Sequence, residues 1–350
     1  MLEVNDVNIL YILLVTFVTS LLLVPITKKV ARHIEALDYP NERKIHFKPM
    51  PRLGGVAIYG AFVLGYMLYG SNSSQMLSIL IGSFLVLFMG VVDDISPIRA
   101  KYKLIVQIIA SLIVVFYGKI YLTEVSVLGL NFVMPSPLNY ILSCLIIVSL
   151  MNAINFMDGL DGMASGISAI YFLTIAIVAY VLNRFGGLDI MLAIIMLGST
   201  LGFLVYNFPP ASTFMGDCGS NFLGFMISVI SLLGFKVTTF TSLIIPFVIL
   251  ALPIFDIALS IFRRLLKGQG IAEPDREHFH HQLLKMKFSP KTSVIIIYLI
   301  NICFAAVSIF YALGDDRFAL VILILLILLL LFIVLKTDIL FEHSKNKNKK

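Results

Sequence analysis

Residues 141–166 read ILSCLIIVSLMNAINFMDGLDGMASG, and they join an apolar run to a segment that contains two asparagines, two aspartates and three glycines. A helix needs about 20 mostly apolar residues to cross the hydrocarbon of a bilayer. The apolar run and its flanks have this composition. We therefore predict a membrane-spanning helix whose end carries a polar cluster, and we ask what such a cluster does there.

The composition of the whole chain points the same way. Its 350 residues are 59% hydrophobic and 13% charged, with a mean hydropathy of +0.98, which excludes an ordinary soluble globular protein. The chain starts MLEVND, without a basic segment or a small-residue cleavage site, so we expect no signal peptide. We predict an all-α, polytopic transmembrane helix bundle, a single integral membrane domain over 1–335 and a basic cytoplasmic tail over 336–350. Its 11 or so spans are expected near residues 8–27, 53–70, 76–92, 104–122, 138–154, 164–182, 189–206, 220–235, 239–262, 292–313 and 318–335.

The positive charges predict the orientation. With the N-terminus outside, 22 of the 26 lysines and arginines fall on the cytoplasmic side, as the positive-inside rule requires. The C-terminal KNKNKK then lies in the cytoplasm beside anionic lipid. Because the basic residues flank membrane spans, we expect no nucleic-acid partner. The three cysteines lack CxxC spacing and indicate neither disulfides nor zinc.

The unusual polar segments all fall on this cytoplasmic side. They predict one active surface that faces the cytoplasm and is assembled from five parts of the chain: residues 41–55, 91–107, 151–166, 206–224 and 263–283.

Five aspartates lie at the ends of apolar helices, where ionised groups are costly and are by default candidates for function: Asp93, Asp94, Asp158, Asp161 and Asp217. Adjacent aspartates repel each other, and a cation between them would relieve that repulsion. Magnesium suits such a site because it takes oxygen ligands from carboxylates and substrate phosphates. The alternative is that Asp93 and Asp94 only cap a helix or pair with Arg99 or Lys101.

The opening segment has two interpretations. If its helix continued, Asn152, Asn155, Gly159, Gly162 and Gly166 would form one stripe of small residues that lets a ligand or another helix approach closely. A plain helix-packing face with a polar cap explains the glycines but not the two carboxylates.

Two further segments leave alternatives open. Asp217 lies between Gly216 and Gly219 before a span, which is either a turn whose backbone N–H groups hold phosphate oxygens or an ordinary N-terminal cap. Phe214 suits either a lipid anchor or a flat wall for a base. In HFHH, residues 278–281, zinc binding, phosphate or sugar recognition and a solvated loop all stay open.

Taken together, the chain resembles the polyprenyl-phosphate N-acetylhexosamine-1-phosphate transferase family. Five motifs occur in order: RKIHFKPMPRLGG, VVDDI with KLIVQ downstream, NAINFMDGLDGMA, YNFPPASTFMGDCGS and PDREHFHH. Within the family it is most similar to the branch that starts wall teichoic acid, O-antigen or enterobacterial common antigen chains. The peptidoglycan branch, which transfers phospho-MurNAc-pentapeptide, usually has a Pro-Ile-His-His-His run where this chain has DREHFHH, so we keep that activity as the alternative.

The resemblance implies a reaction. N-acetylhexosamine-1-phosphate, for which we expect GlcNAc-1-phosphate, would pass from a UDP-sugar to undecaprenyl phosphate in the bacterial cytoplasmic membrane, with release of UMP. It implies Mg²⁺ as cofactor, with Mn²⁺ as a substitute, and it leaves open whether the chain forms a homodimer. A single displacement on the β-phosphorus and a two-step path through a carboxylate both fit the sequence.

The resemblance also implies roles for particular residues. Asp217 resembles the principal magnesium ligand and Asn155 a second one, Phe214 the residue that stacks on uracil, and Asp93 is the candidate base with Asp94 organising the site. Asp158 belongs to the same catalytic wall, with its role open. The remaining predicted substrate-binding residues are Lys44 and Lys103 for phosphates, Gly159, Leu160, Asp161 and Asn207 for the nucleotide, and Arg263, Arg264, His278, His280 and His281 for the diphosphate and sugar.

The sequence disfavours three other classes of protein. An ion-coupled secondary transporter also carries intramembrane acids, but its sites lie near the bilayer midplane rather than at helix ends. A CDP-alcohol phosphatidyltransferase needs an Ala-Arg pair and two more spaced aspartates, which DGLDGMASGISAIYF lacks. A non-catalytic scaffold is disfavoured because every motif carboxylate is present.

Overall fold

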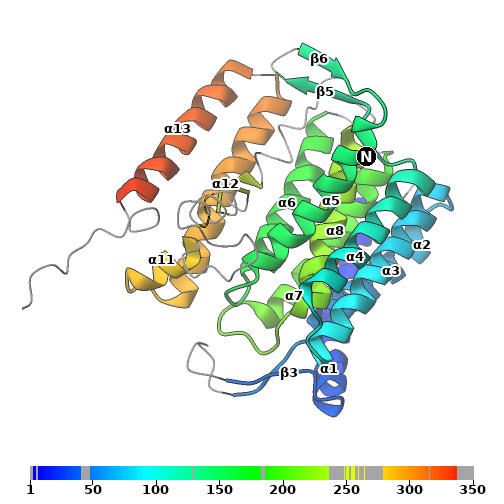
Figure 1. Cartoon of the computed structure of the whole chain (residues 1–350), viewed down its shortest axis with the longest axis vertical. Helices are drawn as coiled ribbons and strands as arrows, with labels where there is room; N and C mark the ends of the chain where they lie inside the picture. Colours follow the sequence, from blue (N-terminus) through cyan, green and yellow to red (C-terminus); the bar gives the residue numbers. More distant parts are fainter. Residues whose placement is uncertain are drawn as a thin grey trace, which may run out of the picture.

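The apolar runs of the sequence fold into long helices in the computed structural model (Figure 1). The structure describes residues 3–4, 7–40, 48–127, 130–182, 186–235, 279–314 and 316–336, with isolated residues between 248 and 264. The helices are α1 (Ile9–His33), α2 (Gly54–Tyr69), α3 (Ser74–Ile95), α4 (Ala100–Leu112) with the π-helical turn η1 (Ile113–Tyr117), α5 (Leu138–Met157), α6 (Met163–Val181), α7 (Leu188–Asn207), α8 (Gly216–Phe235), α11 (Phe279–Lys285), α12 (Pro290–Ala312) and α13 (Asp316–Lys336).

Three short antiparallel strand pairs complete the described fold. They are β1 (Glu3–Val4) with β2 (Val7–Asn8), β3 (Leu37–Asp38) with β4 (Met50–Pro51), and β5 (Glu124–Val127) with β6 (Leu130–Val133). The pair β3–β4 and the pair β5–β6 lie at opposite ends of the helix bundle (Figure 1).

The helices confirm the all-α prediction. Within the described residues, ten predicted spans coincide with helices, and eight of these helices are long and apolar enough to cross a membrane. α2 and the segment Arg317–Leu331 of α13 are apolar but shorter. The predicted span 239–262 lies mostly outside the described residues. The orientation in the membrane stays a prediction.

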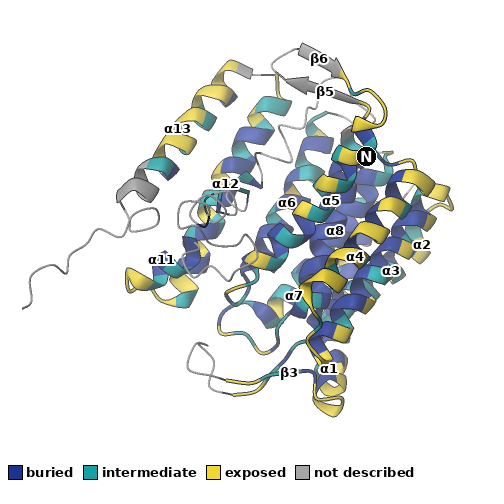
Figure 2. Cartoon of the chain, in the orientation of Figure 1, coloured by how far each residue is buried: buried dark blue, intermediate teal, exposed yellow. Residues whose placement is uncertain are grey.

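Burial separates a central helix from peripheral ones (Figure 2). α8 is buried almost throughout and packs against α3, α5 and α2. α1 instead exposes large apolar side chains such as Leu10, Leu14 and Leu22. Hydrocarbon solvates such side chains without the cost that water imposes, so this face is suited to lipid.

Two helix crossings place charged residues at one end of α8. A Cβ on Gly90 of α3 would overlap the Cα of Cys218, and a Cβ on Gly55 of α2 would overlap the Cα of Gly219. Only small residues permit such close approach. Asp94 lies one turn beyond Gly90, so this crossing brings its carboxylate to the start of α8.

Residues 151–166 do not form one continuous helix, so the stripe of small residues that depended on such a helix is not formed. α5 ends at Met157, and Gly162, at φ +76°, occupies the left-handed region before α6 begins at Met163. The break also changes the role of the glycines. The Tyr298 hydroxyl of α12 donates to the Gly162 carbonyl, and its ring fills the space beside Gly166. These two glycines therefore admit a helix rather than a ligand.

Candidate active site

Three helices bring a lysine and two aspartates into contact. Lys103 Nζ of α4 lies 2.6 Å from Asp93 Oδ2 of α3 and 2.6 Å from Asp217 Oδ2 of α8. Asp93 Oδ1 also accepts a hydrogen bond of 2.9 Å from the Ile98 backbone N–H. The Lys103 ammonium therefore lies between the carboxylates of Asp93 and Asp217, not between the adjacent Asp93 and Asp94, and it offsets their mutual repulsion.

Asp94 has a different task from its neighbour Asp93. Its carboxylate accepts hydrogen bonds from the backbone N–H groups of Asp217, at 2.9 Å, and Cys218, at 3.1 Å, so it caps α8 from another helix. Of the two alternatives for this turn, the structure shows a helix cap, although its acceptor is Asp94 rather than Asp217 itself. Gly216, at φ +74°, makes the turn that permits this cap.

Arg52 is a residue that sequence reasoning missed. Its guanidinium lies 3.4 Å from Asp94, 3.6 Å from Asp38 and 3.7 Å from Asp217. Burial alone would lower the pKa of Arg52, but these carboxylates outweigh it and raise the pKa. In the alternative interpretation, Asp93 and Asp94 paired with Arg99 or Lys101; the structure instead pairs Asp94 with Arg52 and Asp93 with Lys103. Arg52 stands within the motif KPMPRLGG, which was the available signal.

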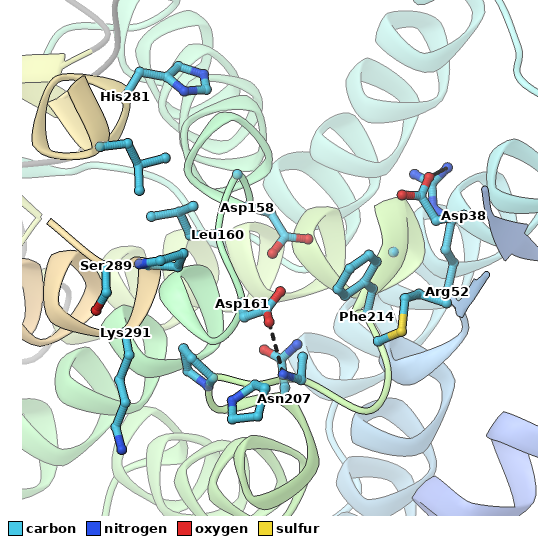
Figure 3. A pocket seen from close by; sticks show the side chains of 18 residues that line it. Asp38, Arg52, Asp158, Leu160, Asp161, Asn207, Phe214, His281, Ser289 and Lys291 are labelled. Atoms are coloured by element: carbon cyan, nitrogen blue, oxygen red, sulfur yellow. Dashed lines mark hydrogen bonds and ion pairs between the residues drawn. The ribbon is translucent and has the colours of Figure 1, made fainter. Parts of the chain in front are cut away.

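A pocket of roughly 690 Å³ adjoins this charge cluster (Figure 3). Asp158, Asp161 and Phe214 lie around its centre, with Arg52 and Asp38 on one side and His281, Ser289 and Lys291 on the other. Gly159, Leu160, Asn207 and Gly216 also line it. The structure thus gathers the nucleotide-binding residues predicted from two separate motifs.

The backbone fixes Phe214 in the wall of this pocket. Its N–H donates to the Pro51 carbonyl at 2.8 Å, and its own carbonyl accepts from the Gly54 N–H at 3.1 Å. These bonds join the segment after β4 to the segment before α8. Of the two interpretations of Phe214, the pocket wall is supported and the lipid anchor is not.

The two aspartates after α5 differ in their surroundings. Asp161 Oδ2 accepts a hydrogen bond of 2.9 Å from the Ala211 N–H, which ties the 158–162 turn to the loop after α7. Burial, followed by the nearby charge of Asp217, raises the pKa of Asp158 to about 7, although Arg52 opposes this shift. Asp158 is therefore poised to exchange a proton near neutral pH.

Asn207 and Asn155 use their amides within the protein. Asn207 Oδ1 accepts from the Gly162 N–H and the Ser165 hydroxyl, and its Nδ2 donates to the Thr213 carbonyl at 3.0 Å. It therefore braces the pocket wall, and its contact with a nucleotide stays a prediction. Asn155 Nδ2 donates to the Ser220 hydroxyl at 2.9 Å, which leaves its amide oxygen for a cation.

The histidine segment is partly described. The rings of His280 and His281 lie 4.1 Å apart, and the His280 ring packs against Gly159. His280 is buried, as is Arg264. Lys44, Arg263 and His278 lie outside the described residues, so their predicted roles stay predictions. Among the residues that the structure describes, no three His, Cys, Asp or Glu side chains form a metal-binding group.

The donor chemistry of the site nevertheless fits magnesium. Mg²⁺ is usually held by one or two carboxylates together with substrate phosphates and water, rather than by a complete protein cage. Asp217 and Asn155 supply oxygens of this kind from α8 and α5, and Ser220 links their helices through its bond to Asn155. The residues predicted as metal ligands therefore lie on helices that the structure holds together.

Comparisons with known proteins identify the family to which this chain is similar. Residues 76–235 match the sequence model of glycosyl transferase family 4. The chain is 41% identical over 314 residues to the "Probable undecaprenyl-phosphate N-acetylglucosaminyl 1-phosphate transferase" of Bacillus subtilis, covering 87% of this chain and 85% of that one. It is 32% identical over 298 residues to the "Decaprenyl-phosphate N-acetylglucosaminephosphotransferase" of Mycobacterium leprae, with 77% and 75% covered. It is 28% identical over 304 residues to the "Undecaprenyl-phosphate alpha-N-acetylglucosaminyl 1-phosphate transferase" of Escherichia coli K12, with 84% and 81% covered.

Proposed function

Because this chain belongs to glycosyl transferase family 4, we propose that it transfers GlcNAc-1-phosphate from UDP-GlcNAc to undecaprenyl phosphate and releases UMP. The family predicted from the five motifs is confirmed. One observation carries the proposal. Arg52 pairs with Asp217 of the Asp93–Lys103–Asp217 cluster and also lines the pocket that contains Phe214, so the charge cluster and the pocket form one site.

The arrangement suits an in-line phosphoryl transfer. A phosphate oxygen of the lipid attacks the β-phosphorus of the UDP-sugar, the new P–O bond forms, and the bond to the UMP oxygen breaks. Asp93 takes the proton of the lipid phosphate where that phosphate still carries one. Lys103 and Arg52 balance the negative charge spread over the transferring group, and such preorganised charges supply most of the catalysis in this kind of reaction.

The pocket provides for the nucleotide. The uracil ring stacks on Phe214, the segment Gly159–Asp161 lies along the nucleoside, and the diphosphate points toward Arg52. The acceptor is a lipid, and its phosphate reaches the same end of the helices from the membrane.

Asp217 and Asn155 would hold Mg²⁺, with Mn²⁺ as a substitute. A bound Mg²⁺ supplies Lewis-acid polarisation of phosphoryl oxygens. Lys103, which pairs with Asp217 in the structure, would be freed to face the transferring phosphate where such an ion bound, since a divalent ion and an ammonium compete for the same carboxylate oxygen.

The distribution of lysines and arginines indicates the side of the membrane on which the reaction takes place. The site lies at the end of the bundle that the positive-inside rule assigns to the cytoplasm of a bacterial membrane, where UDP-sugars are made. The product, a lipid-linked sugar diphosphate, is the first membrane intermediate of a cell-surface glycan such as wall teichoic acid.

The test is a transfer assay in detergent. Purified protein is incubated with undecaprenyl phosphate, Mg²⁺ and, side by side, UDP-GlcNAc, UDP-GalNAc or UDP-MurNAc-pentapeptide, and released UMP is measured. We expect UMP with UDP-GlcNAc and none with the Asp217→Ala variant. Detergent abolishes vectorial transport but permits transfer, so absence of UMP with all three donors would refute the proposal.

A further inference from the structure

Three amide side chains form a buried network one helical turn from the charge cluster. Gln107 Nε2 of α4 donates to Asn221 Oδ1 of α8 at 2.9 Å, and Gln107 Oε1 accepts from Asn152 Nδ2 of α5 at 2.9 Å. Gln107 is 2% exposed and Asn221 1% exposed. We call Gln107, Asn152 and Asn221 the amide triad.

The remaining amide groups of the triad also have hydrogen-bond partners. Asn152 Nδ2 also donates to the Val148 carbonyl at 2.8 Å, and Asn221 Nδ2 donates to the Asp217 carbonyl at 2.8 Å. Buried amides that lack partners are costly, whereas a satisfied network specifies one arrangement of the elements that carry it. This network therefore selects one rotation for each of three helices.

Each member of the amide triad is paired in sequence with a residue of the proposed site. Gln107 lies four residues after Lys103 on α4, Asn221 lies four residues after Asp217 on α8, and Asn152 lies three residues before Asn155 on α5. Residues three or four apart share one face of a helix. The rotation that forms the network is thus the rotation that brings Lys103, Asp217 and Asn155 toward one another.

We propose that the amide triad is a set of positioning residues for the transfer reaction, which sets the separation of Lys103 and Asp217 without touching either substrate. The bond from Asn221 to the Asp217 carbonyl is its most direct link, since it holds the backbone of the proposed metal ligand. Gln107 and Asn152 lie within the motif segments KLIVQ and NAINF, but the resemblance assigns them no role. None of the three residues lines the pocket.

The proposal predicts a loss of turnover without a matching loss of binding. Gln107→Met keeps the length of the side chain and removes its hydrogen bonds to α5 and α8. We expect its kcat to fall about 10- to 100-fold, because small misplacements of reacting groups have effects of this size. The KM values for UDP-GlcNAc and undecaprenyl phosphate should stay within about 3-fold, since the pocket itself is unchanged.

A matched control separates positioning from general stability. Tyr171 of α6 bonds to Ser231 of α8 at 2.7 Å, which is also a buried polar contact between two helices. Ser231 lies 14 residues beyond Asp217, or about 21 Å along the helix. Tyr171→Phe should lower the unfolding temperature in detergent but leave kcat within about 2-fold.

A double-mutant cycle completes the test. If the amide triad acts as one unit, Gln107→Met combined with Asn221→Leu should lose little more kcat than the worse single variant. Asn152→Ala, at a half-buried position, serves in place of any variant that does not fold. Wild-type kcat in Gln107→Met, or an equal loss in Tyr171→Phe, would overturn the inference. It rests on the proposed function, whose own failure would be recognised because the wild-type protein would release no UMP.

Discussion

The carboxylate of Asp94 accepts a hydrogen bond of 2.9 Å from the backbone N–H of Asp217, so one aspartate holds the helix end that presents the other. Two of the conspicuous acids in the sequence thus have separate tasks. Asp94 organises the start of α8, and Asp217 faces Lys103. Substitutions at the two positions should therefore differ in what they damage.

Asp94→Ala is expected to destabilise the protein as well as inactivate it. Two N–H groups at the start of α8 would lose their acceptor, at a cost of about 1–3 kcal/mol for each buried donor left unpaired. Asp217→Ala should instead lower turnover by at least about 1000-fold, as expected for removal of a metal ligand and charge partner, and should keep the wild-type unfolding temperature. Thermal unfolding in detergent and UMP release measure the two effects. Equal unfolding temperatures for both variants would contradict the division of tasks.

Lys103→Met should separate metal affinity from turnover. Without the ammonium between Asp93 and Asp217, a divalent ion no longer competes with a positive charge. We expect Mn²⁺ to bind at least about 3-fold more tightly in calorimetry without substrates, while turnover falls by about 100-fold because a preorganised positive charge is lost. Unchanged Mn²⁺ affinity would show that Lys103 and the metal do not share these oxygens. Lys101→Met, on the same helix, is the matched control.

Asp158 should make stability depend on pH in a defined direction. Its pKa is raised from 3.8 to about 7, so the folded protein holds a proton that the unfolded chain releases. Stability then falls as the pH rises from about 4 through 7, and the full cost is present above pH 7. Asp158→Asn removes this loss. We expect its gain in unfolding temperature over wild type to be larger at pH 8 than at pH 5, by about 2 °C or more. A gain independent of pH would contradict the shifted pKa.

Phe214 should contribute to nucleotide binding and little to the chemical step. Base–aromatic stacking is worth about 1–3 kcal/mol, so Phe214→Leu should raise the KM for UDP-GlcNAc by about 10-fold and leave kcat within about 3-fold. Phe214→Tyr keeps the aromatic face and should behave like wild type. If the leucine and tyrosine variants had the same KM, stacking on this ring would be excluded.

Much of the fold could be predicted because membrane helices leave a strong signal in sequence. Apolar runs of about 20 residues located ten helices to within a few residues. Hydropathy did not find the ends that leave the hydrocarbon. α1 continues to His33, beyond the predicted end near residue 27, because Lys28 and Lys29 end the apolar run but are good helix formers. It also missed the hairpin β5–β6, which has no long apolar run.

The position of the site could be predicted from the sequence, but the contacts between its side chains could not. The end of the bundle was predicted from where polar motifs fall, and Arg52, Asp158, Asp217 and His281 do gather there. The pairings were not predictable, since Lys103 and Asp217 are 114 residues apart and their contact depends on how α4 and α8 are rotated. A single sequence gives spacing along one helix but not the rotation between two helices.

Lys103 also affects the stability of the protein when a chelator removes divalent ions. Since its ammonium balances Asp93 and Asp217 from within the chain, the acidic end of the bundle has a counter-charge of its own whether or not a divalent ion is bound. Treatment with EDTA should therefore leave a folded, dormant protein, and activity should return in full when Mg²⁺ is restored. Such a protein could be purified and stored free of metal without harm.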